Sequence, residues 1–195
     1  MKLLFIDSCI RGPKSRTKIL CDHFINKFTA KNPDWQIERV SINDLEIEAF
    51  DLKSLEERNE LLAKKDFSDK SFDLAKQLME SDQIVLGAPY WDLSFPAKLK
   101  AYLEQCSVTG LTYIYNDMGI PEGQCRAKAL TYITTSGGPI GDMNYGYDYI
   151  KGLCKLFGIE KTYFASAEML DVIGVDVQQA IEDAKVKITE IVEAL

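Results

Sequence analysis

The chain has 195 residues, of which 46% are hydrophobic and 27% are charged, proportions typical of one folded globular domain over residues 1–195. Its 23 lysines and arginines and 30 aspartates and glutamates leave a net charge of −7, which argues against a general binder of nucleic acid or of anionic membranes. The five scattered cysteines form no C-x-x-C pair. Neither a disulfide framework nor a metal site is therefore expected, and a reducing cytoplasm is the simplest location.

Short apolar runs alternate with helical patterns along the chain. The first run follows Lys2 and ends at Asp7, so it is too short for a signal peptide and predicts a strand. The predicted strands are residues 2–7, 36–40, 83–88, 127–134 and 161–165. The predicted helices are residues 15–30, two within 55–81, 96–106, 145–157 and 176–195. The expected buried face of the first helix is Ile19, Leu20, His23, Phe24 and Phe28.

Five strands that alternate with helices predict an α/β fold, a doubly wound five-stranded parallel sheet with helices on both faces. Right-handed crossovers leave few topologies, and the flavodoxin-like order 2-1-3-4-5 is the common one. Such sheets bind ligands beyond the carboxyl ends of the strands, at the point where the order reverses. We therefore expect the loops at residues 8–17, 89–95 and 135–147 to form the site.

The first of these loops carries four positive charges and no negative one over residues 8–18. It precedes a predicted helix, whose N-terminus offers unpaired N–H groups to phosphate, and Ser15 and Thr17 add hydroxyl donors. Because the loop contains neither G-x-x-x-x-G-K-[ST] nor G-x-G-x-x-G, it favours a single phosphate over a nucleoside triphosphate or a Rossmann-bound dinucleotide. The alternative is a plain helix with Ser15 as its N-cap.

The other two loops have different chemistry. Tyr90 and Trp91 follow the third predicted strand and lie between two prolines, which make the loop stiff enough to grip a flat heterocycle. The fourth strand leads into paired glycines, Gly137 and Gly138, which allow a backbone to approach a ligand closely. Each feature also has a plain interpretation, as rings that cover the core and as an ordinary turn.

The segment A-P-Y-W-D-L-S-F-P-A-K-L-K at residues 88–100 resembles the A-P-x-Y-N-F-x-x-P-x-x-L-K motif of the FMN-dependent NADH:azoreductases. This group lies within the flavodoxin-like NAD(P)H:quinone oxidoreductase family. T-T-S-G-G at 134–138, G-L-T-Y at 110–113, P-E-G at 121–123 and the following Lys128 also match, in the same order over nearly the whole chain.

The resemblance implies an FMN-dependent oxidoreductase that passes electrons from NADH or NADPH, by ping-pong hydride transfer, to quinones, azo compounds or similar small-molecule acceptors. It also implies a homodimer with the flavin near the interface. The chemistry belongs to the flavin, so no catalytic side chain is expected. By position, the phosphate and ribityl contacts would be Cys9, Ser15, Arg16 and Thr17, and the contacts to the isoalloxazine would be Pro89, Tyr90, Trp91, Asp92, Leu93, Thr135, Gly137 and Gly138.

Three positions depart from the family motif. Cys9 replaces a serine, Asp92 an asparagine and Leu93 a phenylalanine. An ionised Asp92 beside the flavin would lower its potential by repelling the reduced ring; the alternative is that Asp92 caps the helix opened by Pro96.

The predictions for several other residues are less specific. Tyr145 and Tyr147 follow the third loop and either border the substrate pocket or pack in the core or a dimer interface. We expect His23 to be structural and the cysteines to be buried small hydrophobes.

Two rival functions share the predicted topology. A flavodoxin-type FMN electron carrier without its own NAD(P)H turnover fits the acidic charge, but such a carrier does not need the excursion at residues 110–126. A phospho-receiver domain would need an aspartate at the end of the third strand, where this chain has Pro89 and Tyr90.

Overall fold

The structure is a computed structural model and describes all 195 residues. Its central sheet contains five parallel strands, β1 (Lys2–Asp7), β2 (Gln36–Ser41), β3 (Gln83–Gly87), β6 (Ala129–Thr135) and β7 (Lys161–Ala167). Their spatial order is β2-β1-β3-β6-β7, which confirms the predicted 2-1-3-4-5 order.

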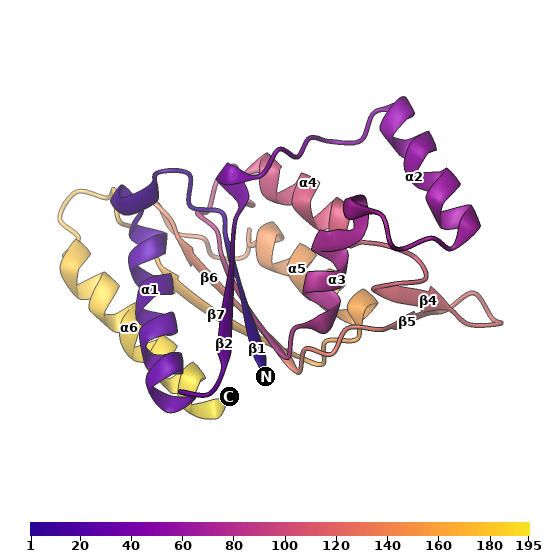
Figure 1. Cartoon of the computed structure of the whole chain (residues 1–195). Coiled ribbons are helices and arrows are strands. Elements are labelled where there is room, and N and C mark those ends of the chain that lie inside the picture. The colour runs from indigo at the N-terminus through magenta and orange to yellow at the C-terminus, as the bar shows by residue number, and fades with distance from the viewer.

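Helices cover both faces of this sheet (Figure 1). The helices are α1 (Arg16–Lys31), α2 (Leu52–Lys64), α3 (Asp73–Glu80), α4 (Ala97–Cys106), α5 (Tyr145–Phe157) and α6 (Val177–Ala194), and all but α2 pack on the sheet. On one face α1 and α6 pack together over Phe5 and Val85. On the other face α3, α4 and α5 cover Leu4, Ile6 and Leu86. No helix is both long enough and apolar enough to cross a membrane.

The register of the sheet brings the ends of β1 and β3 to one level, beside β6, which continues two residues further to Thr135. Asp7 at the end of β1 is opposite Gly87 of β3, and Gly87 is opposite Ile133 of β6. The Ser8 N–H donates to the Gly87 carbonyl at 2.9 Å, and the Ala88 N–H donates to the Ile133 carbonyl at 3.0 Å. The loops after β1, β3 and β6 therefore start side by side, as the topology predicted.

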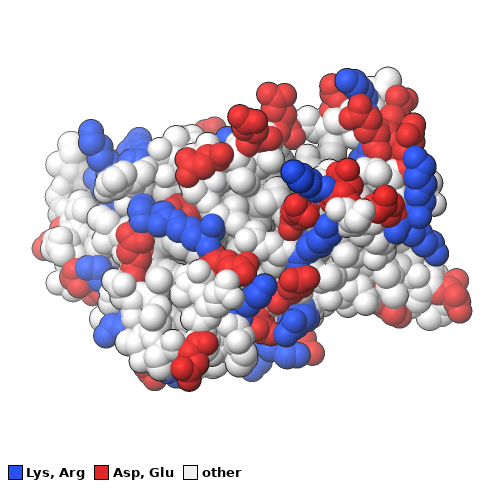
Figure 2. Space-filling model, viewed as in Figure 1, with Lys and Arg blue, Asp and Glu red and all other residues white.

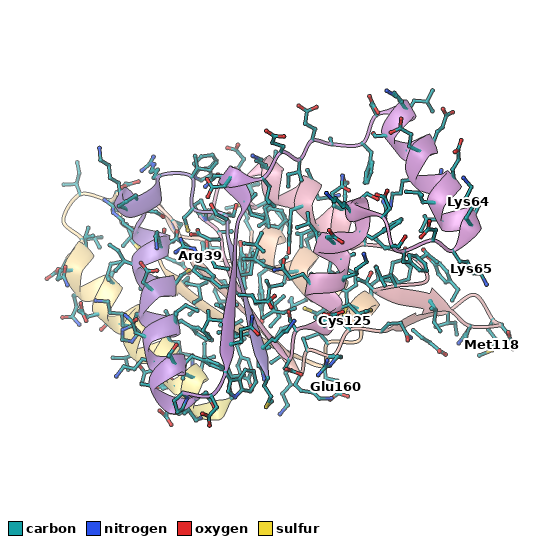
Figure 3. The ribbon with its side chains drawn as sticks, in the orientation of Figure 1. Arg39, Lys64, Lys65, Met118, Cys125 and Glu160 are labelled. Atoms are coloured by element: carbon teal, nitrogen blue, oxygen red, sulfur yellow. The ribbon has the colours of Figure 1, made fainter.

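Two elements project from this framework. Helix α2 has no buried residue, and it stands beside the rest of the molecule (Figure 1). The antiparallel hairpin of β4 (Tyr113–Tyr115) and β5 (Pro121–Gly123) was not predicted and occupies most of the 110–126 excursion. Its turn carries Met118, labelled at the far tip in Figure 3, with 78% of its surface exposed.

The sequence prediction was wrong about one side of α1. Ile19 is 46% exposed and His23 is only partly buried, its Nε2 lying 3.0 Å from the Thr189 hydroxyl on α6. The buried residues of α1 are Thr17, Leu20, Cys21, Phe24 and Phe28. Thr17 was missed because it is not strongly apolar, whereas the burial of Cys21 agrees with the expectation for the cysteines. Four of the five cysteines are buried, and Cys125 is partly exposed.

Helix α1 comes unusually close to the sheet at Gly87. A Cβ atom placed on Gly87 would lie 2.3 Å from the Cys21 sulfur, well inside van der Waals contact. The Cys21 thiol is fully buried, and burial, together with the neighbouring Cys9 thiol, raises its pKa well above the usual value. Cys21 is therefore a neutral thiol packed against the sheet. It fits there because residue 87 is a glycine and has no side chain.

We expect Gly87→Ala to lower the free energy of unfolding by about 1–3 kcal/mol, because overpacking a dense core has a cost of that order. Cys21→Ala alone should cost about 1 kcal/mol, because it deletes a buried sulfur. In the double variant the new methyl group takes the volume that the sulfur leaves, so Gly87→Ala should be nearly neutral there. Urea unfolding of the four proteins measures the coupling, and additive effects would contradict this account.

Candidate functional site

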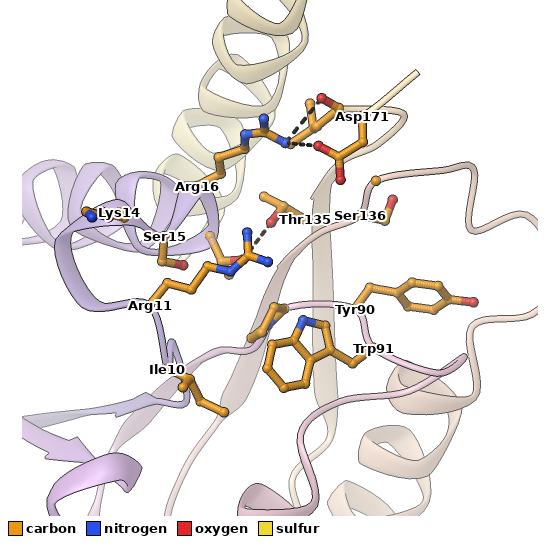
Figure 4. A pocket seen from close by; sticks show the side chains of 14 residues that line it. Ile10, Arg11, Lys14, Ser15, Arg16, Tyr90, Trp91, Thr135, Ser136 and Asp171 are labelled. Atoms are coloured by element: carbon orange, nitrogen blue, oxygen red, sulfur yellow. Dashed lines mark hydrogen bonds and ion pairs between the residues drawn. The ribbon is translucent and has the colours of Figure 1, made fainter. Parts of the chain in front are cut away.

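A polar cleft of about 310 Å³ opens at the carboxyl ends of β1, β3 and β6 (Figure 4). Four loops supply its walls, the fourth being the loop after β7. The lining residues are Ile10, Arg11, Lys14, Ser15, Arg16, Thr17, Pro89, Tyr90, Trp91, Thr135, Ser136, Gly137, Leu170 and Asp171.

One end of the cleft is a cradle of hydrogen-bond donors at the start of α1. Ser15 is the N-cap of α1, and its hydroxyl oxygen accepts the Lys18 N–H at 3.3 Å. The N–H groups of Arg16 and Thr17 donate to no acceptor in the chain, as is usual in a first helical turn. Free donors and the helix dipole make this end attractive to an anion.

Thr17 connects this cradle to the opposite strand. Its hydroxyl oxygen lies 2.7 Å from the hydroxyl oxygen of Thr135 at the end of β6, and its side chain is fully buried from solvent. One of these hydroxyls donates to the other, which leaves the second proton free for another acceptor. The pair therefore fixes the distance between α1 and β6 at the floor of the cleft.

The other end of the cleft is aromatic. Trp91 is 40% exposed and faces the cleft, and Tyr90 lies beside it (Figure 4). The Tyr90 N–H donates to the Thr135 carbonyl at 3.0 Å, which joins the second loop to the third. The Tyr90 hydroxyl donates to the Met143 carbonyl at 2.9 Å. Desolvation raises the pKa of Tyr90, and Glu168 and Tyr145 add to the effect.

Asp92 and Leu93 form a tight turn directly after Trp91. Both have positive φ, 47° and 68°, and Trp91 and Ser94 exchange backbone hydrogen bonds of 3.1 and 2.8 Å across them. Two consecutive left-handed residues are typical of a type I′ turn, which normally carries glycine or asparagine. Leucine is costly there, so the turn holds a strained backbone beside the aromatic end.

The structure changes one interpretation of Asp92. Its carboxylate does not cap α4, because Pro96 is the N-cap there and no side chain bonds to that end of the helix. Neither Asp92 nor Leu93 lines the cleft; both are exposed on the turn at its edge. A flavin contact at these two positions stays a prediction.

The remaining predicted residues fall into two groups. Arg16, Pro89 and Gly137 line the cleft with the residues described above. Cys9 does not line it; this residue is 2% exposed, and its sulfur lies 3.9 Å from the Gly87 carbonyl beneath the loop. Gly138 follows the lining residues of the third loop without lining the cleft itself.

The two tyrosines proposed for a substrate pocket differ from each other. Tyr145 is 55% exposed at the first turn of α5. Tyr147 points into the structure, stacked on Tyr132 with ring centroids 6.0 Å apart, and its hydroxyl donates to Thr162 at 3.2 Å. Tyr147 is partly buried and packs as the core alternative expected, whereas Tyr145 is exposed, and a substrate contact at either residue stays a prediction.

Six lining residues were absent from the predicted set: Ile10, Arg11, Lys14, Ser136, Leu170 and Asp171. Arg11 and Lys14 belong to the cluster of positive charges that identified the first loop. Their charge alone would have been enough to include them among the predicted phosphate contacts. Leu170 and Asp171 come from the loop after β7, which the sequence analysis did not consider. That loop reaches the cleft through backbone bonds from Leu170 to Ser136 and from Asp171 to Gly137, at 3.1 and 3.0 Å.

The electrostatics of the site differ from those of the chain as a whole. Lysine and arginine side chains gather over the N-terminal end of α1, whereas acidic side chains gather over the segment before α2 (Figure 2). At the end of β1 the Asp7 carboxylate, 4% exposed, pairs with Arg39 of β2 and accepts the Cys9 N–H at 3.0 Å. Asp7 is not a lining residue, so the cradle keeps its positive potential.

Comparisons with known proteins agree with this fold and cleft. The sequence matches the family described as having a flavodoxin-like fold over residues 1–192. It is 34% identical to an FMN-dependent NADH:quinone oxidoreductase of Coprothermobacter proteolyticus, with 88% of this chain and 87% of the relative covered. It is 33% identical to the protein of the same name in Caldicellulosiruptor saccharolyticus, with 97% of each covered.

Solved structures show the same fold at lower identity. An azoreductase from Bacillus anthracis str. Sterne superimposes with a TM-score of 0.87 at 18% identity and covers 100% of both chains. An FMN-dependent NADH-azoreductase from Bacillus anthracis str. Ames Ancestor, solved in complex with FMN, gives a TM-score of 0.85 at 19% identity, with 99% of this chain and 98% of that chain covered.

Proposed function

Because the chain belongs to the flavodoxin-like family of the FMN-dependent NADH:quinone oxidoreductases, we propose that it is an FMN-dependent enzyme that transfers electrons from NADH to a quinone or azo acceptor. The single observation that carries this proposal is the two-ended cleft. A donor cradle at the start of α1 and an aromatic end at Trp91 face one continuous space of about 310 Å³.

The donor set fits the phosphate of FMN. The N–H groups of Arg16 and Thr17, the hydroxyls of Ser15 and Thr17, and the Arg11 guanidinium, which points into the cleft in Figure 4, are all suited to bind phosphate oxygens. Trp91 and the backbone from Pro89 to Trp91 offer a flat apolar surface for the ring. Cys9, Asp92, Leu93 and Gly138 do not line the cleft, and we retain their contacts to FMN as proposals.

When bound, FMN supplies the hydride chemistry, because its ring accepts and returns two electrons. The chain itself would bind the cofactor and orient it. The Thr17–Thr135 pair holds the two walls of the cleft together, and the stiff second loop presents Trp91. If one face of the bound ring stays open to solvent, NADH and the acceptor would use that face in turn, which is the ping-pong scheme.

We also propose that the enzyme is a homodimer whose interface includes the stretches 111–115 and 145–149. Ile114, Tyr115 and Tyr145 are 38%, 56% and 55% exposed, and large apolar groups at this level of exposure favour burial against a partner. Tyr145 adjoins the aromatic end of the cleft, so a second copy there would enclose the ring.

The first experiment tests the cofactor and the activity together. The purified protein should carry FMN, identified by mass spectrometry of the released flavin, and should oxidise NADH with a quinone or an azo dye as acceptor. Release of FAD alone would contradict the single-phosphate cradle. A protein that binds FMN but shows no NADH turnover would instead be an electron carrier, the rival function.

Removal of two hydroxyls tests the cradle. In Ser15→Ala/Thr17→Ala, the loss of two charge-assisted hydrogen bonds worth roughly 1.5–3 kcal/mol each should weaken FMN binding by on the order of a hundredfold or more. Riboflavin, which lacks the phosphate, should lose much less affinity. Fluorescence titration with both flavins measures the difference.

The control for this variant is Asp51→Ala, which removes the N-cap of the distant helix α2. It should destabilise the protein by about 1 kcal/mol, as the loss of the Ser15 cap does, without changing FMN affinity. If the double variant binds FMN as the wild type does, Ser15 is only a helix cap and the cradle is not a phosphate site.

Light scattering tests the dimer. The protein should be dimeric at micromolar concentration, and Tyr115→Lys should shift it towards monomer, because a buried lysine charge has a high desolvation cost. Ile173→Lys is the matched control, since Ile173 is fully exposed outside both stretches. A wild-type protein that stays monomeric would refute the proposal.

A further inference from the structure

Asp171 is the only acidic residue that lines the cleft, where it faces three basic residues, Arg11, Lys14 and Arg16. It comes from the loop after β7, far along the chain from the basic first loop. A carboxylate in an anion-binding cleft opposes the ligand electrostatically, so its position requires an explanation.

The carboxylate of Asp171 engages Arg16 directly (Figure 4). Arg16 Nη1 donates to Asp171 Oδ1 at 2.7 Å and to the Leu170 carbonyl at 3.1 Å. These two bonds aim one guanidinium nitrogen at the loop after β7. A phosphate at the start of α1 would therefore share the charge of this guanidinium with the Asp171 carboxylate.

The backbone holds Asp171 in this position. Its N–H donates to the Gly137 carbonyl at 3.0 Å. A Cβ on Gly137 would lie 2.5 Å from Asp171 Oδ2, so the carboxylate packs over Gly137 in the space that a side chain would fill. The absence of a side chain at Gly137 therefore makes room for an acidic group of the chain itself.

We propose that Asp171 is a specificity-determining residue that competes with the phosphate of the bound cofactor for Arg16 and thereby limits how strongly the cleft prefers a phosphorylated flavin. The inference rests on the proposed function, because it takes the cradle as the FMN phosphate site. A phosphate and a carboxylate are both acceptors for a guanidinium, and each gains from the same charge.

The size of the effect follows from the exposure of the pair. The Arg16 and Asp171 side chains are 42% and 70% exposed, so solvent screens their attraction. Removing the carboxylate charge should tighten FMN binding by about three- to tenfold at low salt. The gain should shrink in 1 M salt, where the Debye length is about 3 Å.

The experiment compares Asp171→Asn with wild type in fluorescence titrations with FMN and with riboflavin. The amide keeps the shape of the side chain and removes its charge. We expect tighter FMN binding and a change of less than about twofold for riboflavin. Asp142→Asn is the matched control, because Asp142 is an exposed acid of the third loop with no hydrogen bond or ion pair, and its removal should leave both affinities unchanged.

A second variant tests whether Arg16 carries the effect. Arg16→Gln should weaken FMN binding only slightly in the wild-type background and should abolish the gain in the Asp171→Asn background. A gain that persists without Arg16 would overturn the competition, because it would then come from the general field of the carboxylate. Unfolding temperatures of all variants check that the fold is intact.

The outcomes separate the inference from the function on which it rests. If wild type prefers FMN to riboflavin and Asp171→Asn binds FMN equally or more weakly, the inference fails and the function stands; weaker binding would mean that Asp171 positions Arg16 for the phosphate. If wild type shows no preference for FMN, the phosphate site fails, and the inference fails with it.

Discussion

The contact between Cys21 and Gly87 sets the geometry on which the cleft depends. Because Gly87 has no side chain, α1 lies close enough to the sheet for its first turn to stand beside the ends of β1, β3 and β6. The hydroxyl oxygens of Thr17 and Thr135 lie 2.7 Å apart and bridge α1 and β6 across this short separation. A larger residue at position 87 would push the helix outward and carry the donor cradle away from the aromatic loop, so a packing constraint in the core decides whether the two ends of the site face one another.

Charge in the cleft is controlled by arginine–carboxylate pairs. Asp7 closes β1, where its carboxylate would face the cradle if it were free, but Arg39 pairs with it on the β2 side. Asp171 enters from the opposite wall and engages Arg16. Arg11 and Lys14 have no such carboxylate partner and supply the positive potential. A chain of net charge −7 thereby keeps a local anion site, because the nearby carboxylates are paired and these two basic residues are not.

Sequence patterns were sufficient where the physics is local or periodic. Strand alternation and helix spacing predicted all five sheet strands, their order and three of the four loops that line the cleft. They failed where distant residues decide the outcome. The bonds of Asp171 to Arg16 and Gly137 join segments that no short pattern connects. The hairpin of β4 and β5 has strands of only three residues each, too short for a periodic signal, and the orientation of Cys9 depends on the carbonyl of Gly87.

The titratable groups near the aromatic end limit what the chain itself can do. The phenol of Tyr90 donates a hydrogen bond to the Met143 carbonyl, and desolvation raises its pKa further from neutral pH. His23, the only histidine, bonds to Thr189 on α6 and does not line the cleft. General acid–base catalysis needs a group with a pKa near the working pH and within hydrogen-bond reach of the reacting atom. Neither residue meets both conditions. The cleft instead offers hydroxyls, guanidinium groups and a flat ring, which bind and orient, and this matches a reaction whose chemistry resides in a bound cofactor.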